Sequence, residues 1–172
     1  EGRRTRAGGR GERMHWAKTM QQAARQDGDV LRLPRMQRKP QALPLLILVD
    51  ISGSMERYAR LLLAFLHQAT RGTPRQVFAF GTGLTDLNPS FKLRDTDDML
   101  TLASRQIQDF AGGTQLGKSL THFRSHFAKK LTGRRTVVLL ISDGLDTGTS
   151  ETLDSEIVWL KRHTRSLLWL NP

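Results

Sequence analysis

The sequence contains no cysteine, and no apolar run in its 172 residues is long. Without cysteine, disulfide bonds and thiolate metal sites are excluded. No stretch of about eighteen apolar residues could cross a bilayer, and no charged segment followed by an apolar one could direct export. We therefore expect a cytoplasmic protein without a transmembrane segment.

Acidic residues are scarce relative to basic ones, and the excess of basic residues lies near the N-terminus. The chain carries 27 Lys and Arg against 16 Asp and Glu, and residues 1–40 hold 11 of the basic residues but only four of the acidic ones. A basic arm of this kind can contact nucleic acid. It lacks interleaved aromatic residues for base stacking, so nucleic-acid binding is a weaker alternative than a solvated linker.

Length and composition bound the number of domains. We interpret residues 1–40 as a basic N-terminal extension with a short helix and residues 41–172 as one globular domain. The chain begins at Glu1 and stops at Pro172, directly after a strand-like run. We therefore expect a piece of a longer protein, truncated at its C-terminus.

Apolar spacing after residue 41 predicts alternating strands and helices. Strands are expected at 45–49, 76–80, 136–142 and 166–170, with an edge strand at 84–87, and helices at 55–71, 95–110, 116–131 and 150–160. This order predicts a Rossmann-like, three-layer α/β sandwich with a mainly parallel central sheet. In the first of these helices, we expect six apolar side chains to be buried: Tyr58, Leu61, Leu62, Phe65, Leu66 and Ala69.

The apolar run from Leu45 to Val49 ends at Asp50, Ser52 and Ser54. The run is too continuous for a half-exposed strand and too short for a stable helix, so it predicts a buried parallel strand. The three oxygen-bearing side chains alternate with other residues and can face the same way. They offer the hard oxygen ligands that Mg²⁺ prefers. By itself the motif fits helix capping about as well.

Two later residues favour the metal site. Thr114 follows a Gly-Gly turn, and Asp143 follows a second buried run, Val137 to Ile141. Ligand sites in open parallel sheets form beyond the carboxyl ends of the strands, so the ends of both runs can meet at one edge.

These residues resemble the metal-ion-dependent adhesion site (MIDAS) of the von Willebrand factor A (VWA) domain family, which reads Asp-x-Ser-x-Ser, then Thr, then Asp. The matching positions here are Asp50, Ser52, Ser54, Thr114 and Asp143. The resemblance implies that these five residues hold Mg²⁺ or Mn²⁺. It also implies a non-catalytic interaction module that binds an Asp or Glu of a partner protein through the metal.

A closer resemblance covers nearly the whole chain. The segments DISGSM, FAGGTQLGKSL, VVLLISDGLDTG and WLNP resemble the CoxE-like branch of the family. That branch comprises bacterial proteins tied to the maturation of molybdenum hydroxylases such as carbon monoxide dehydrogenase. The resemblance implies a MoxR-type AAA+ ATPase, or its client enzyme, as the partner. Phe110-Ala111 and Leu145 depart from the branch pattern, but none of them is an expected metal ligand.

A rival interpretation comes from residues 112–119, which match the nucleotide-binding pattern GxxxxGK[ST] letter for letter. With Asp143 as a magnesium-linked carboxylate, this segment would indicate an NTPase. A P-loop follows a buried strand, however, and the segment before Gly112 has helical spacing and few β-branched residues. An NTPase would also leave Asp50, Ser52 and Ser54 without a role. The metal motif itself contains no His, Cys or Lys that could serve as a base or nucleophile for hydrolysis. We therefore expect a protein that is not an enzyme and keep the NTPase as the alternative.

Overall fold

The computed structural model describes residues 5–8, 13–25, 33–38, 42–53, 55–107, 114–145, 148 and 150–172. Contacts within the chain divide it into two compact units, Glu1–Ala42 and Leu43–Pro172. Each unit is described by itself. Within the described ranges, no helix combines the length and apolarity needed to cross a membrane.

The first unit contains the predicted short helix, α1 (Trp16–Arg25). It also contains three short strands that the sequence does not predict, β1 (Thr5–Gly8), β2 (Arg13–Met14) and β3 (Arg35–Arg38). These strands form an antiparallel sheet in the order β1-β3-β2. The N-terminal segment therefore has a small fold of its own.

The second unit is built on a five-stranded sheet. Its strands are β4 (Leu45–Asp50), β5 (Arg75–Phe80), β6 (Leu84–Asp86), β7 (Val137–Ile141) and β8 (Ser166–Leu170), in the order β6-β5-β4-β7-β8. All neighbours pair in parallel except β6, which runs antiparallel to β5. The mainly parallel sheet predicted from the sequence is confirmed. β4 lies at its centre between β5 and β7, and Val49 pairs with both Ala79 and Ile141.

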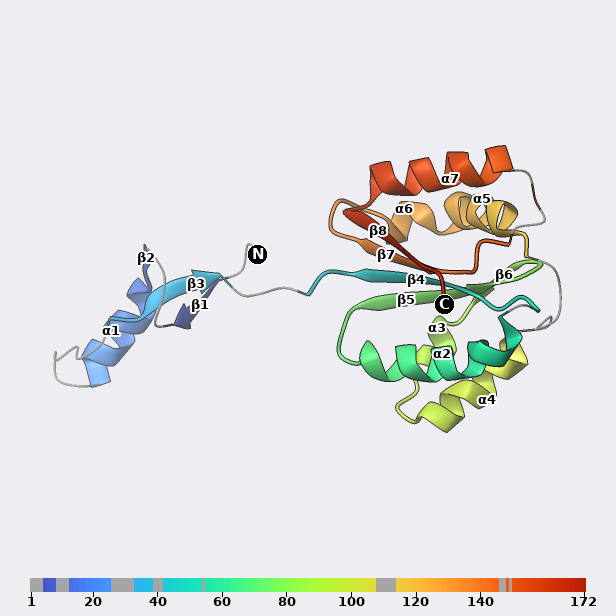
Figure 1. Ribbon diagram of the computed structural model, residues 1–172. Helices are drawn as coiled ribbons and strands as arrows, with labels where there is room; N and C mark the ends of the chain where they lie inside the picture. Colours follow the sequence, from blue (N-terminus) through green and yellow to red (C-terminus); the bar gives the residue numbers. More distant parts are fainter. Residues whose placement is uncertain are drawn as a thin grey trace. The chain divides into compact units, whose positions relative to one another are not determined.

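Helices cover both faces of this sheet (Figure 1). One face packs against α2 (Glu56–Ala69), α3 (Asn88–Phe91) and α4 (Thr96–Gln106), and the other against α5 (Leu116–His126), α6 (Ala128–Leu131) and α7 (Ser150–His163). Successive side chains of a strand point to opposite faces. Ile47 and Val49 of β4 accordingly join the apolar cluster under α2, while Leu46 and Leu48 join the one under α5. Burial on both faces explains the unbroken apolar run.

The orientation of α2 differs from the sequence prediction. Ala59, Leu63 and Leu66 are buried, whereas Tyr58, Leu61 and Phe65 are exposed by 59%, 73% and 64%. The prediction was therefore wrong for three of its large side chains, and Ala69 is exposed as well. Successive residues of a helix are about 100° apart, so the buried stripe is displaced by roughly one residue from the predicted one. Both stripes are apolar, and periodicity alone could not choose between them.

The helix predicted over 116–131 is divided at Phe127. α5 ends at His126 and α6 begins at Ala128. The Phe127 ring packs against Phe78 of β5, with 4.9 Å between the ring centroids. The second piece thus still contributes to the core on the α5 face.

Candidate metal centre

Asp50 is the last residue of β4 and is completely buried. Its Oδ1 accepts the backbone N–H of Ser52 at 2.9 Å, and its Oδ2 accepts the hydroxyl of Ser142 at 2.7 Å. In the described part of the chain, no Lys, Arg or His forms an ion pair with this carboxylate. A buried carboxylate is costly unless it is paired or binds a cation, and neutral hydrogen bonds offset only part of that cost.

Ser142 links β4 to β7 at the candidate centre. Since Val49 pairs with Ile141, the next residues along both strands, Asp50 and Ser142, also face each other. The Ser142 hydroxyl accepts the backbone N–H of Gly144 at 3.0 Å, and the Ser142 carbonyl accepts the indole N–H of Trp169 at 3.0 Å. Sequence reasoning missed this serine. Its place directly after a buried run, in register with Asp50, is the signal that could have found it.

Asp143 lies one residue further on, partly exposed at the same edge of the sheet. Its Oδ1 accepts the backbone N–H of Leu145 at 3.1 Å. Gly144, between them, has a φ of +80°, a conformation that residues with a side chain rarely adopt. The glycine therefore turns the chain so that the Asp143 carboxylate stays at the end of β7.

Thr114 belongs to a third segment and is buried, with 4% of its surface exposed. The backbone N–H of the next residue, Gln115, donates to the carbonyl of Gly81 at 2.9 Å. Gly81 directly follows β5, the neighbour of β4. Thr114 is thus held at the carboxyl end of the strands, as Asp50 and Asp143 are. Ser52 is buried beside Asp50, and Ser54 lies outside the described residues.

A protein-family comparison bears directly on this arrangement. The family model for VWA domain containing CoxE-like protein matches residues 1–172, the whole chain. The chain belongs to this CoxE-like VWA family. No curated protein matched in a separate comparison.

Solved structures share the fold of this CoxE-like VWA domain. Proximal thread matrix protein 1 from the mussel byssus, with a zinc-occupied MIDAS motif, has a TM-score of 0.54 at 17% identity over 74% of this chain and 37% of its own. A von Willebrand factor type A protein from Catenulispora acidiphila gives 0.52 at 17% identity over 78% and 34%. Manganese-loaded TRAP protein from Plasmodium vivax gives 0.52 at 20% identity over 75% and 57%. The chain thus spans between a third and three fifths of these proteins' lengths.

The donor set of the CoxE-like VWA domain fits a hard divalent cation. The described candidates supply only oxygen: carboxylates from Asp50 and Asp143 and hydroxyls from Ser52 and Thr114. No group of three or more His, Cys, Asp or Glu side chains that could hold a metal occurs within the described ranges. A metal site here would therefore need the hydroxyl groups as well as the two carboxylates. Oxygen donors of this kind suit Mg²⁺ or Mn²⁺ better than softer metals.

The surroundings of residues 112–119 do not support a P-loop in this domain. The last described element before them is a helix, α4, which ends at Gln106. Gly117 is buried where α5 packs on α7, and a Cβ at this position would lie 3.2 Å from the backbone nitrogen of Leu153. Close helix packing therefore explains this glycine without any phosphate. Lys118 is exposed in the first turn of α5.

Proposed function

We propose that the chain is a non-catalytic, metal-dependent protein-interaction module. In this proposal Ser52, Ser54 and Thr114 bind Mg²⁺ or Mn²⁺ through their hydroxyls, and Asp50 and Asp143 do so directly or through water. VWA domains are generally non-catalytic and mediate protein–protein interactions. The observation that carries the proposal is the fully buried Asp50, which has hydrogen bonds but no basic partner within the described residues.

The chain's own groups would prepare the site in two ways. The Ser52 N–H and the Ser142 hydroxyl each bind one oxygen of Asp50, so they fix its orientation and leave further lone pairs on both oxygens. Two carboxylates balance the charge of a divalent cation without excess. When bound, the cation supplies electrostatic attraction for a further carboxylate, from an Asp or Glu of a partner.

Membership of the CoxE-like family supports a more specific setting. There the module assists maturation, or cofactor insertion, of a molybdenum hydroxylase of the carbon monoxide dehydrogenase type in the cytoplasm. Its partner would be a MoxR-type AAA+ ATPase or the client enzyme. Co-purification of such a partner in Mg²⁺, with loss in EDTA and in Asp50→Asn, tests this setting.

The metal site itself is tested by calorimetric titration with Mg²⁺ and Mn²⁺. Asp50→Asn removes the charge but keeps the shape and an acceptor oxygen, so we expect the folded variant to lose binding. Asp154→Asn, an exposed Asp of α7, is the matched control and should bind as the unchanged protein does. ATP binding that is lost in Lys118→Ala would contradict the proposal and favour the NTPase.

A further inference from the structure

The segment WLNP, residues 169–172, contains none of the five candidate metal ligands, but its tryptophan reaches the candidate metal centre. Trp169 lies in β8, and its indole N–H donates to the carbonyl of Ser142 at 3.0 Å. Ser142 is the residue whose hydroxyl donates to Oδ2 of Asp50 at 2.7 Å. A single residue, Ser142, therefore lies between the indole and a buried candidate ligand.

The end of the β7–β8 pairing explains why a side chain binds the Ser142 carbonyl. The pairing extends as far as the Ser142 backbone N–H, which donates to the carbonyl of Leu170 at 3.1 Å. In a regular parallel pairing, the Ser142 carbonyl would then accept the backbone N–H of the residue two positions after Leu170. That residue is Pro172, which has no N–H. The indole of Trp169 thus supplies the donor that the main chain lacks.

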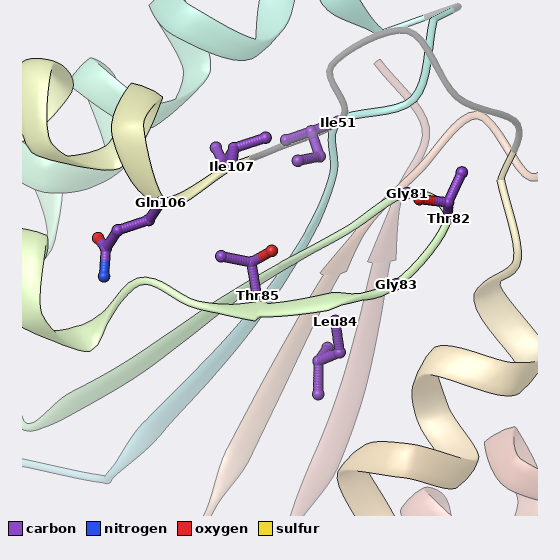
Figure 2. A pocket seen from close by; sticks show the side chains of 8 residues that line it. All are labelled: Ile51, Gly81, Thr82, Gly83, Leu84, Thr85, Gln106 and Ile107. Atoms are coloured by element: carbon purple, nitrogen blue, oxygen red, sulfur yellow. The ribbon is translucent and has the colours of Figure 1, made fainter.

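The other side of the candidate centre has the regular arrangement. Ile51, which directly follows Asp50, donates its backbone N–H to the carbonyl of Phe80 at 2.9 Å. Figure 2 shows Ile51 in the wall of a cavity of about 220 Å³, together with the turn at residues 81–85. On this side, the main chain alone holds the residue that follows a candidate ligand. On the β8 side, a tryptophan side chain provides the corresponding bond.

The bond to the Ser142 carbonyl also fixes how the chain enters Asp143. A peptide unit is planar, so the Ser142 carbonyl and the Asp143 N–H belong to one rigid group. The next residue, Gly144, has a φ of +80°, and a Cβ at this position would lie 3.8 Å from Cζ2 of Trp169. The indole therefore lies beside the turn that carries the second candidate carboxylate.

We propose that Trp169 is a positioning residue of the metal centre, because its indole N–H holds the peptide between Ser142 and Asp143. The inference rests on the proposed function and adds a residue outside the ligand set. This peptide joins two groups that the metal needs: the Ser142 hydroxyl, which orients Asp50, and the Asp143 carboxylate. Without the indole N–H, both groups lose their common anchor. Metal binding by the folded protein should therefore weaken.

Trp169→Phe tests the proposal with the full chain. Phenylalanine keeps an aromatic ring on β8 but removes the N–H donor. In calorimetric titrations with Mg²⁺ and Mn²⁺, we expect the folded variant to bind about fivefold more weakly, the effect of one hydrogen bond. Trp159→Phe makes the same chemical change on α7, where the ring contacts Arg124 and His163, and it should leave the affinity unchanged.

A second substitution can return the missing donor. Pro172→Ala restores a backbone N–H at the position from which regular pairing would reach the Ser142 carbonyl. Combined with Trp169→Phe, it should bring the affinity back to within about twofold of the unchanged protein. A loss of affinity that Pro172→Ala does not recover would assign the effect to ring packing and overturn the proposal.

The ¹⁵N spectrum of the unchanged protein adds a measurement that does not depend on the folding of Trp169→Phe. The chain has three tryptophans, so Trp16→Phe and Trp159→Phe assign the indole N–H signal of Trp169 by elimination. Saturating Mg²⁺ should shift this signal and leave that of Trp159 in place. An unshifted Trp169 signal would contradict the proposal.

The outcomes separate this inference from the proposed function. If Mg²⁺ binds and requires Asp50, but folded Trp169→Phe binds it as tightly as the unchanged protein, only this inference is wrong. The tryptophan then has a purely structural role at the end of β8. If neither Mg²⁺ nor Mn²⁺ binds the unchanged protein, both the proposed function and this inference are wrong.

Discussion

Two buried polar clusters lie at opposite edges of the sheet. At the amino ends of the strands, His67 is fully buried, and both of its ring nitrogens have partners: Nε2 faces the Leu93 carbonyl at 2.9 Å, and Nδ1 faces the Thr96 hydroxyl at 3.1 Å. At the carboxyl ends, Asp50 is equally buried, but within the described residues its carboxylate has two neutral donors and no basic partner. Burial of a titratable side chain is thus common to both clusters. The clusters differ in their hydrogen bonds and charges: the His67 ring has a partner at each nitrogen, whereas the Asp50 carboxylate has no basic partner within the described residues.

A network of hydrogen bonds also connects the residues around His67. Arg75 donates to the carbonyls of His67 and Phe91 at 3.0 Å and 2.9 Å and to the Thr70 hydroxyl at 2.6 Å. Burial of the guanidinium lowers the pKa of Arg75 from its ordinary value, and the positive charge of the nearby Arg71 lowers this pKa further by a smaller amount. The network ties the end of α2 to the start of β5. Its role is therefore stability, and the comparison with Asp50 can be tested variant by variant.

The largest expected effect is a loss of stability when the cluster around His67 is disrupted. His67→Ala removes a buried ring and leaves its partners unpaired, so it should lower the free energy of unfolding by about 3 kcal/mol in urea titrations. His122→Ala is the matched control, because that ring is exposed and stacks on the rings of His126 and Phe127 at the surface, and it should cost less than about 0.5 kcal/mol. The Mg²⁺ affinity of folded His67→Ala should be unchanged. An equal loss of stability in both variants would remove the contrast.

The next effect concerns the cluster around Asp50. Mg²⁺ at one hundred times its dissociation constant should raise the free energy of unfolding by about 2.7 kcal/mol, because it binds only the folded chain. Asp50→Asn should show no such rise, and EDTA should reverse it in the unchanged protein. Without metal, we expect Asp50→Asn to be at least as stable as the unchanged protein, since it removes an uncompensated buried charge. A clear loss of stability in EDTA would indicate that Asp50 is a structural residue.

These two clusters also show what the sequence could predict. The runs 45–49 and 137–141 are buried on both faces, so they gave a continuous apolar signal, and the fold and family predictions are confirmed. The candidate ligands follow from the ends of those runs, and their coordination remains a prediction. The prediction of the buried face of α2 was wrong because two neighbouring stripes of that helix are apolar. The strands β1 and β3, TRAG and RMQR, have no alternation of apolar residues to reveal them.

A smaller effect is expected at Ser142, which contacts the Asp50 carboxylate. Ser142→Ala removes the hydroxyl that orients Asp50 Oδ2, so Mg²⁺ binding should weaken about tenfold in calorimetric titrations. Stability in EDTA should fall by only about 1 kcal/mol. Ser155→Ala on α7, whose exposed hydroxyl donates to the Thr152 carbonyl, should change neither quantity. Unaltered affinity in Ser142→Ala would show that the hydroxyl does not prepare the carboxylate.

The smallest expected effect is a change in the pH dependence of stability. It involves Asp95, an exposed carboxylate next to Thr96 of the His67 cluster. Asp95 caps α4, where its Oδ1 accepts the backbone N–H groups of Asp97 and Asp98 at 2.8 Å and 3.0 Å. The hydrogen bonds from Asp98 and Asp97 lower the pKa of Asp95 below its ordinary 3.8. Its stabilising contribution is therefore present above about pH 4 and is lost as the pH falls through the lowered value, because the unfolded chain takes up the proton first.

Asp95→Asn keeps a good capping side chain but cannot titrate. The variant should consequently lose less stability than the unchanged protein when urea titrations at pH 5 are compared with those at pH 3. Asp97→Asn removes a charge in the same turn of α4 and serves as the control, with the slope of the unchanged protein expected. If Asp95→Asn had that slope too, the cap would contribute nothing to the acid sensitivity of the domain.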